Sequence, residues 1–376
     1  MILWEKGNAR VEFRIALAGD FLPAAGLSVT ENCDWKCRAA RLAQYFENID
    51  LAMANLECPV GVESCAARPK IGLGDSFSAP SASVEYLAAL RVKVAGIANN
   101  HIYDCGFEGM HRTAQAIKHR GMTPLGSGRD LGEAPDIFVA DTPFGGRVGF
   151  WAAARNLPEM ATRTRAGVEP ANKPRARAAV AELRRQGTKL NFAFLHAGIE
   201  HTNRPDPDDV EFMDDLIEIG FSIVAASHSH RIGGYRALTG KNGRQGFCFY
   251  GLGSLSSGIR YSVLEHEGLV AVVGLDAAGD IARVEVQPIL LSADGWGTIP
   301  EWASAKNILD RFMMLSLEIA DGSYRRQFYE DTGRDLIRRQ YRNLRAAYQS
   351  GGLLGLAQLL SRIRMRHVNR VLHKAF

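Results

Sequence analysis

Residues 222–230 read SIVAASHSH, an apolar strand-like run that ends in two histidines. Four other strand-like runs also end in potential metal ligands. These ends are Gly19-Asp20, Asn55-Leu56-Glu57, Asn99-Asn100-His101 and His196-Ala197-Gly198-Ile199-Glu200. Because the carboxyl ends of strands in open α/β sheets converge on one crevice, residues far apart in the sequence can assemble there into one site. The sequence therefore predicts a site at the strand ends.

Short apolar runs alternate with helical patterns from about residue 11 to about residue 290, which predicts an α/β domain. The expected strands are Arg14–Ala18, Ile49–Ala54, Val92–Ile97, Arg147–Ala152, Leu190–Leu195, Ile223–Ala226 and Phe247–Tyr250. The expected helices of this part are Ser81–Leu90, Gly109–Lys118 and, after Pro174, the rest of Ala171–Arg185.

Beyond Pro300 the pattern becomes wholly helical, with expected helices at Glu301–Ile319, Ser323–Gln349 and Leu353–Phe376. We therefore expect an α/β domain over residues 1–295 and a helical, basic C-terminal region over residues 296–376.

This C-terminal region is strongly basic at its end. From Arg334 to Phe376, ten Arg or Lys stand against one acid, Asp335, so the local charge is 10 − 1 = +9. Such a segment can contact an anionic membrane surface or an acidic polymer. Its basic and apolar positions are interleaved, however, which favours a solvated or oligomer-forming helix pair. Peripheral membrane contact is the alternative.

The overall composition is that of an ordinary globular protein, with 23% charged residues and a formal net charge of +4 over 376 residues. This charge does not indicate a nucleic-acid partner. No apolar run approaches the roughly 20 residues of a membrane span, and the first residues carry charges where a signal peptide needs an apolar core. We therefore expect a cytoplasmic protein.

The six cysteines, at positions 33, 37, 58, 65, 105 and 248, lack the paired spacing of a structural zinc site. Reduced thiols are the expectation. A metal shared by Cys33 and Cys37 on one helical turn is the less favoured alternative.

The residue types at the strand ends indicate the metal. Imidazole nitrogen with carboxylate and amide oxygen suits Mn, Zn or Fe, whereas a calcium site would be all oxygen. We expect two divalent transition-metal ions roughly 3.5 to 4 Å apart, bridged by one carboxylate, since such a pair activates water and clamps phosphoryl oxygens.

Each candidate has a purely structural explanation when it is taken alone. Asp20 could end a strand in a turn, and Asn99-Asn100 could cap a helix or form a turn. His196 could be a hydrogen-bonded core histidine. His228 and His230 are harder to explain in this way, because two residues in an i, i+2 relation on a strand point to the same side. Together the five segments favour a site.

Several segments also resemble a known family. Phe77-Ser-Ala-Pro80 and residues 95–130, AGIANNHIYDCGFEGMHRTAQAIKHRGMTPLGSGRD, resemble the central signature of the CapA family of bacterial capsule synthesis proteins. AsnLeuGlu, HisAlaGlyIleGlu, SerHisSerHis and TyrGlyLeuGlySer recur in the family's order, and the resemblance spans about residues 14 to 291. It implies a calcineurin-like metallophosphoesterase fold, with two packed β-sheets flanked by helices, and a link to capsular or extracellular polymers such as poly-γ-glutamate.

The resemblance also implies roles for single residues. The implied metal ligands are Asp20, Glu57, Asn100, His196, His228 and His230, with Glu57 as the bridging carboxylate. His101 matches the family's non-ligand histidine, which would act as general acid or oxyanion partner. Asp104 is expected to orient His101, and Glu200 to hold a ligand histidine or the substrate. Leu22 stands where the Asp-x-His pattern of the wider superfamily places a histidine.

Two functions follow from these expectations. The first is a dinuclear metal-dependent hydrolase that acts on a phosphoester, or on another ester or amide linkage of an anionic or polymeric substrate, in capsule or extracellular polymer synthesis. The second is a non-catalytic polymer-assembly or binding factor with a structural or vestigial metal site. Leu22 favours the second function, and the strand-end ligands favour the first.

Overall fold

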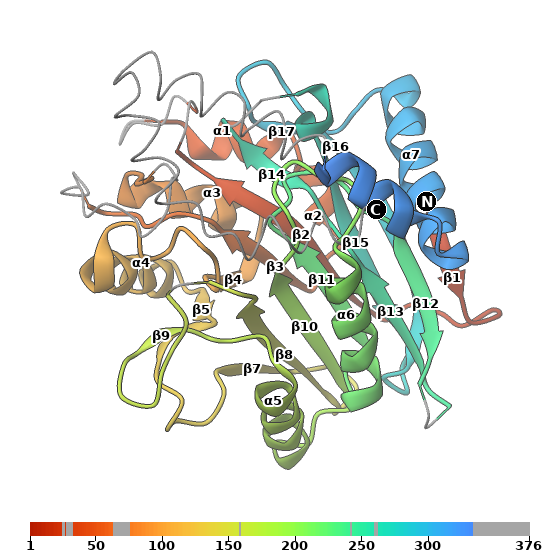
Figure 1. The fold of residues 1–376 in the computed structure, drawn as a ribbon, viewed down its shortest axis with the longest axis horizontal. Helices are drawn as coiled ribbons and strands as arrows, with labels where there is room; N and C mark the ends of the chain where they lie inside the picture. The colour runs from red at the N-terminus through yellow and green to blue at the C-terminus, as the bar shows by residue number, and fades with distance from the viewer. Residues whose placement is uncertain are drawn as a thin grey trace.

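Two packed β-sheets flanked by helices form the framework of the protein (Figure 1). The structure is a computed structural model and describes residues 1–24, 27, 33–62, 76–157, 159–240, 243–258 and 262–333. The expected α/β class and the expected pair of packed sheets are confirmed.

The larger sheet has nine strands and carries the N-terminal part of the chain. Its main order is β1 (Ile2–Glu5), β16 (Ile281–Leu291), β15 (Glu267–Leu275), β2 (Phe13–Leu22), β3 (Leu51–Leu56), β4 (Val92–Gly96) and β5 (Thr123–Leu125). In addition, β14 (Ser254–Ser257) pairs with β2, and β17 (Gly297–Thr298) pairs with β16. The pairings from β2 to β5 are parallel, so these strands end at the same edge.

The second sheet has six strands, in the order β12 (Tyr235–Thr239), β13 (Gln245–Phe249), β11 (Ile223–Ser227), β10 (Leu190–His196), β8 (Arg147–Ala154) and β7 (Ile137–Asp141). Its four central strands, from β13 to β8, are parallel to one another. A short separate ribbon pairs β6 (Ser127–Arg129) with β9 (Gly167–Val168).

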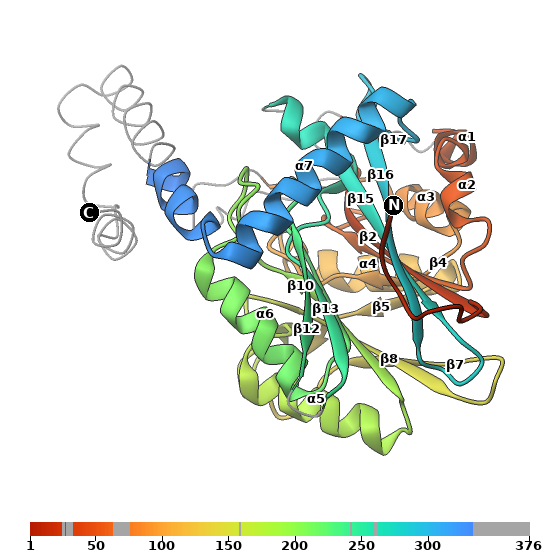
Figure 2. The same ribbon diagram turned by 90° about the vertical axis from the view of Figure 1, so that its right-hand side faces the viewer.

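Helices cover the outer faces of both sheets. Those beside the nine-stranded sheet are α1 (Trp35–Ala40), α2 (Ala43–Phe46), η1 (Ser81–Ser83), α3 (Val84–Ala89) and α4 (Gly106–His119), and η2 (Val263–His266) precedes β15. The six-stranded sheet is covered by α5 (Lys173–Arg185) and α6 (Pro207–Ile219), and α7 (Trp302–Asp321) packs against β12 and β16 (Figure 2).

The sequence explains where α5 and α6 begin. The side chain of Asn172 accepts a hydrogen bond from the backbone N–H of Arg175, and the side chain of Asp206 accepts one from Asp208. Each cap is followed by a proline within the first two helical positions, where its missing N–H costs nothing.

The main core lies between the two sheets, and a second apolar cluster lies beneath α5 and α6. Leu17, Phe192 and Phe247 are fully buried members of the main core. Trp151 of β8 and Leu183 of α5 belong to the second cluster. Because the central strands of the six-stranded sheet are covered on both faces, they read as continuous apolar runs rather than as alternating patterns.

All seven expected strands exist, with ends shifted by up to four residues. The expected helices of the α/β domain also exist, and α7 confirms the predicted helix Glu301–Ile319. Residues 324–333 are helical, while the rest of the expected helix Ser323–Gln349, the helix Leu353–Phe376 and the basic segment from Arg334 lie outside the described residues. The proposed boundary at residue 295 and the membrane or polymer contact of this segment stay predictions.

The cysteine expectation needs a correction. Cys33, Cys37, Cys58 and Cys248 are free, but Cys105 is disulfide-bonded, so the expectation of reduced thiols throughout is wrong. Disulfides persist mainly in oxidising compartments. The cytoplasmic location stays a prediction, and the Cys105 bond weighs against it.

None of the described helices is both long and apolar enough to span a membrane.

The close approach of two backbone segments at Gly19 and Gly253 leads to a prediction about stability. A Cβ atom at Gly19 would lie only 1.9 Å from the carbonyl oxygen of Gly253, the same oxygen that accepts a hydrogen bond from the N–H of Asp20. Gly19→Ala should therefore destabilise the protein by about 1–3 kcal/mol, as overpacking does, and lower the unfolding midpoint. Gly333→Ala is the control, because no atom of the described residues lies within 4 Å of its Cβ position. Equal midpoints for the two variants would contradict this account.

Candidate metal centre

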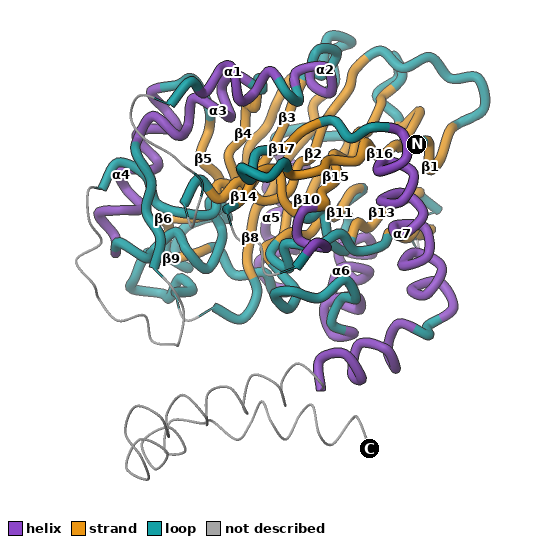
Figure 3. The backbone as a smooth tube through the Cα atoms, turned by 90° about the horizontal axis from the view of Figure 1, so that it is seen from above, coloured by secondary structure: helices purple, strands orange, loops and turns teal. Residues whose placement is uncertain are grey.

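The candidate site lies where the ends of strands from both sheets meet (Figures 1 and 3). Asp20 is on β2, and Glu57 directly follows β3, whereas His196 ends β10 and His228 directly follows β11. The backbone N–H of His228 donates to Oδ2 of Asp20 at 3.0 Å, which ties the second sheet to the first. The predicted convergence of strand ends is thus what the structure shows.

Five acidic and imidazole side chains form two groups that share one carboxylate. The first group is Asp20, Glu57 and His230, and the second is Glu57, His196 and His228. Within each group, one donor atom from every residue lies within 4.8 Å of the others. Glu57 is therefore placed to bridge two ions.

The sixth expected ligand, Asn100, belongs with the second group. Its Oδ1 lies 2.7 Å from Nε2 of His196, and the same Nε2 lies 3.4 Å from Oε1 of Glu57. We call Asp20, Glu57 and His230 position A, and Glu57, Asn100, His196 and His228 position B. All six expected ligands thus lie together, while their binding of metal stays a prediction.

The surroundings of these side chains fit divalent cations. Asp20 and Glu57 are both 0% exposed. Two carboxylates so close together and so deeply buried are stabilised by a nearby cation, because removing their charges from water is costly. Nδ1 of His228 is buried and has no hydrogen-bond partner among the described residues. The mixed nitrogen and oxygen donors suit Mn, Zn or Fe.

The pKa values of the two turn histidines, His228 and His230, are shifted in opposite directions. Burial disfavours the charged form of His230, but Glu57 and Asp20 outweigh it and raise its pKa to about 10. Burial lowers the pKa of His228 to about 4, although Glu200 opposes the shift. Without metal, His230 thus carries a proton near neutral pH, and His228 does not. Because a ligand imidazole must be neutral, an ion entering position A displaces that proton, and its binding strengthens as pH rises.

The geometry of the two turn histidines corrects one expectation. His228 and His230 were expected on a strand, pointing the same way, but β11 ends at Ser227. Their φ angles are +126° and +56°, which non-glycine residues rarely adopt. This turn sends the two imidazoles to different positions, His230 to A and His228 to B. Such strained conformations persist where the surrounding structure over-determines them, typically at functional sites.

Two asparagines orient the site by hydrogen bonds. Nδ2 of Asn55 donates to Oδ1 of Asp20 at 2.7 Å and lies 3.4 Å from Nδ1 of His196. Asn99 donates to Asn55 and accepts from the backbone N–H groups of His101 and Ile102. The side chain of Asn99 thus caps the backbone N–H groups that follow it, whereas Asn100 lies beside the candidate ligand His196.

His101 lies beside the centre and in neither donor group. Its Nδ1 donates to Oδ2 of Asp104 at 2.7 Å, and Asp104 also accepts the backbone N–H of Phe77. The Phe77 ring lies against the imidazole, with centroids 4.7 Å apart. These contacts fix the ring and its tautomer, as the expected orienting role of Asp104 requires.

Glu200 lies near the same histidines and is partly exposed. Burial alone would raise its pKa, but His228, His230, His201 and His101 together lower it. Its Oε2 is 4.0 Å from Nε2 of His201, with 37% of the side chain exposed. A contact with a ligand histidine or with substrate stays a prediction for Glu200.

Sequence reasoning missed Glu265, a carboxylate of η2 that is 0% exposed. Its Oε1 lies 3.1 Å from Nδ1 of His201 and 3.1 Å from Nη2 of Arg231. His201 belongs to the loop after His196, and Arg231 directly follows His230, so Glu265 ties together the two ligand-bearing loops. In the sequence, Glu265 is 35 residues from the nearest candidate ligand, His230, and lies in no motif. Its position near the site is therefore seen only in the structure.

Other candidates lie apart from the centre. Neither Cys33 nor Cys37 belongs to a metal-capable group among the described residues.

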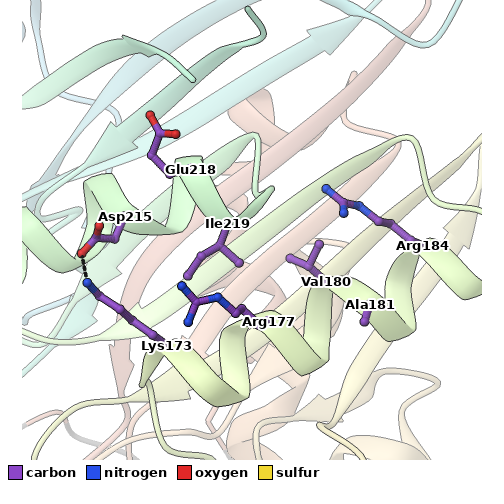
Figure 4. A pocket seen from close by; sticks show the side chains of 8 residues that line it. All are labelled: Lys173, Arg177, Val180, Ala181, Arg184, Asp215, Glu218 and Ile219. Atoms are coloured by element: carbon purple, nitrogen blue, oxygen red, sulfur yellow. Dashed lines mark ion pairs between the residues drawn. The ribbon is translucent and has the colours of Figure 1, made fainter. Parts of the chain in front are cut away.

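A groove of about 540 Å³ lies between α5 and α6, where Lys173 pairs with Asp215 at 2.6 Å (Figure 4). Its other lining residues are Arg177, Val180, Ala181, Arg184, Glu218 and Ile219. No residue of positions A and B lines it, so this groove is not the opening of the metal centre.

The fold and the donors together define a two-sheet α/β protein with a candidate dinuclear metal centre. The family described as "Bacterial capsule synthesis protein PGA_cap" matches residues 14–258, and the chain belongs to this family. The expected CapA-type resemblance is confirmed.

Among curated relatives, the chain is similar to the capsule biosynthesis protein CapA of Bacillus anthracis, with 25% identity over 57% of this chain and 52% of that protein. A probable polyglutamine synthesis accessory protein of Mycobacterium tuberculosis is 28% identical over 52% of this chain and 54% of that protein. The chain thus matches about half the length of these curated relatives.

Solved structures with similar folds include a 5′-nucleotidase precursor of Thermus thermophilus, with a TM-score of 0.47 and 16% identity over 80% of this chain and 58% of that chain. The calcineurin-like phosphoesterase YfkN of Bacillus subtilis has a TM-score of 0.44 and 14% identity over 82% of this chain and 98% of that chain.

The position of Glu265 yields a prediction about metal binding. Glu265→Gln removes the charge that holds His201 and Arg231, which loosens both ligand loops. Affinity for Mn²⁺, measured by calorimetry on metal-free protein, should fall by about 10–100-fold, the usual effect of losing support behind metal ligands. Glu108→Gln is the matched control, because Glu108 pairs with Arg112 on the exposed side of α4. Unchanged affinity in a folded Glu265→Gln protein would assign Glu265 no part in the centre.

Proposed function

We propose that this protein is a dinuclear metal-dependent hydrolase that serves capsule or extracellular polymer synthesis. The observation that carries the proposal is the sharing of Glu57 between two donor groups. A single structural ion would need only one such group. Family membership supports the link to capsule synthesis.

When bound, two divalent ions would supply Lewis-acid activation of water and of the bond to be cleaved. Position A would hold one ion through Asp20 and His230, and position B the other through Asn100, His196 and His228, with Glu57 in common. Both positions lie at the converging strand ends, where substrates of open α/β sheets bind.

His101 would protonate the leaving group or hydrogen-bond the developing negative charge. Asp104 holds Nδ1 of His101, which leaves Nε2 for the substrate. This arrangement has the parts that general acid catalysis requires, a ring beside the centre held by a buried carboxylate.

The substrate we propose is an anionic or polymeric molecule with a phosphoester, another ester or an amide linkage. The names of the relatives, one in capsule biosynthesis and one in polyglutamine synthesis, support a polymer or its precursor. Metal positions that attract carboxylate or phosphoryl oxygens fit such a substrate.

One observation favours a second function, that of a polymer-assembly factor with a vestigial centre. Leu22 is 0% exposed and lies in the main core, two residues beyond Asp20 on β2, where the resemblance places a histidine. A hydrocarbon side chain supplies no donor, so position A has lost one.

Turnover with added Mn²⁺ on aryl phosphomonoesters and phosphodiesters, measured together with metal content, tests the hydrolase proposal. His101→Ala should keep its metal and lose turnover by about 10²–10⁴-fold, the usual share of general acid–base catalysis. His111→Ala is the control, because His111 is an exposed residue of α4.

Two results would count against this proposal. Stoichiometric metal without turnover on any substrate of the panel would favour the assembly factor. Loss of metal in His101→Ala, with His111→Ala unaffected, would make His101 a ligand instead of a general acid.

A further inference from the structure

The two metal positions have unequal sets of donors. Glu57 is common to both, so its charge does not favour either. Among the acidic, cysteine and histidine side chains of the described residues, position A has two donors beyond Glu57, Asp20 and His230. Position B has three, because Asn100 lies 2.7 Å from Nε2 of His196 and joins His196 and His228.

Leu22 lies close to position A in the sequence but supplies no donor to it. Asp20 and Leu22 are both on β2 and pair with β14 at Ser254 and Ser257, and residues two apart on a strand point to the same side. Leu22 thus shares the side of β2 that directs Asp20 into the centre. Its side chain packs in the main core and offers only carbon atoms.

The protein environment of position A is therefore less complete than that of position B. Each lost protein donor lowers affinity and leaves a coordination position to water or to the substrate, as in catalytic sites that keep an open position. Position B, with four protein donors including the shared Glu57, has the number typical of a closed tetrahedral site.

Resting on the metal centre of the proposed function, we propose that position B holds a resident ion, whereas position A binds a second ion weakly and exchanges it with solvent. The protein then keeps one ion per chain through purification. Its second ion arrives from added metal, and an oxygen of the substrate can take the place of the absent imidazole.

Metal titration of the full chain tests this proposal without any activity measurement. Metal-free protein is titrated with Mn²⁺ by calorimetry, and ions retained after dialysis are counted by elemental analysis. We expect two binding steps that differ by at least about tenfold in affinity, and one ion retained per chain.

A matched pair of variants assigns the steps. His228→Ala should abolish the tight step, while His230→Ala, the same change two residues further on, should abolish only the weak step. Leu22→His restores an imidazole on the Asp20 side of β2 and should strengthen the weak step by about 10–100-fold. Leu22→Met is its control, because it keeps the volume and adds no nitrogen. If Leu22→His fails to fold, the comparison of His228→Ala with His230→Ala still assigns the tight and weak binding steps.

The outcomes distinguish a failure of the unequal metal positions from a failure of the dinuclear centre. Two steps of equal affinity in the unaltered protein, or a tight step that survives in His228→Ala and is lost in His230→Ala, would overturn the unequal positions while leaving a dinuclear centre intact. Failure of the unaltered protein to bind any Mn²⁺ would instead overturn the dinuclear centre itself, and this inference with it.

Discussion

The burial of one carboxylate, Glu57, is the constraint on which the candidate site depends. Glu57 is fully buried at the end of β3, and its backbone N–H donates to the carbonyl of Phe21, which fixes it against β2. Its oxygens face His196 at 3.4 Å and His230 at 3.7 Å. A buried charge costs several kcal/mol unless a cation compensates it. His230, whose pKa is raised to about 10 by Glu57 and Asp20, faces the carboxylate on one side.

The rest of the fold supplies this geometry from two directions. Parallel strands bring Asp20 and Glu57 to one edge of the nine-stranded sheet, and the parallel strands of the other sheet bring His196 and His228 to face them. Asn55 joins the two edges, and Glu265 holds the loops behind the histidines. The chain thus uses rigid strand ends for the ligands and buried polar contacts to orient them, which is how metal sites keep their geometry.

Sequence reasoning found the parts of the site that follow from strand topology. Apolar runs ending in Asp20, Glu57, His196 and His228 predict their meeting, because parallel strands end at one edge. The same reasoning gave the wrong geometry for His228 and His230, since positive φ angles at non-glycine residues leave no pattern in the sequence.

Long-range partners were also beyond sequence reasoning. Glu265 belongs to no periodic pattern, and its role depends on contacts with His201 and Arg231, which are distant in the sequence. The disulfide at Cys105 likewise leaves no periodic pattern. The strands β15 and β16 went unpredicted although both are long. The helix α6 also went unpredicted, despite its Asp206 cap and Pro207.

An anomalous difference map of crystals saturated with Mn²⁺ would show whether Glu57 bridges two ions. We expect two peaks roughly 3.5 to 4 Å apart, with the Glu57 carboxylate between them, one beside His230 and the other beside His228. A single peak at saturating Mn²⁺, or two peaks that do not share Glu57, would rule out this bridging role.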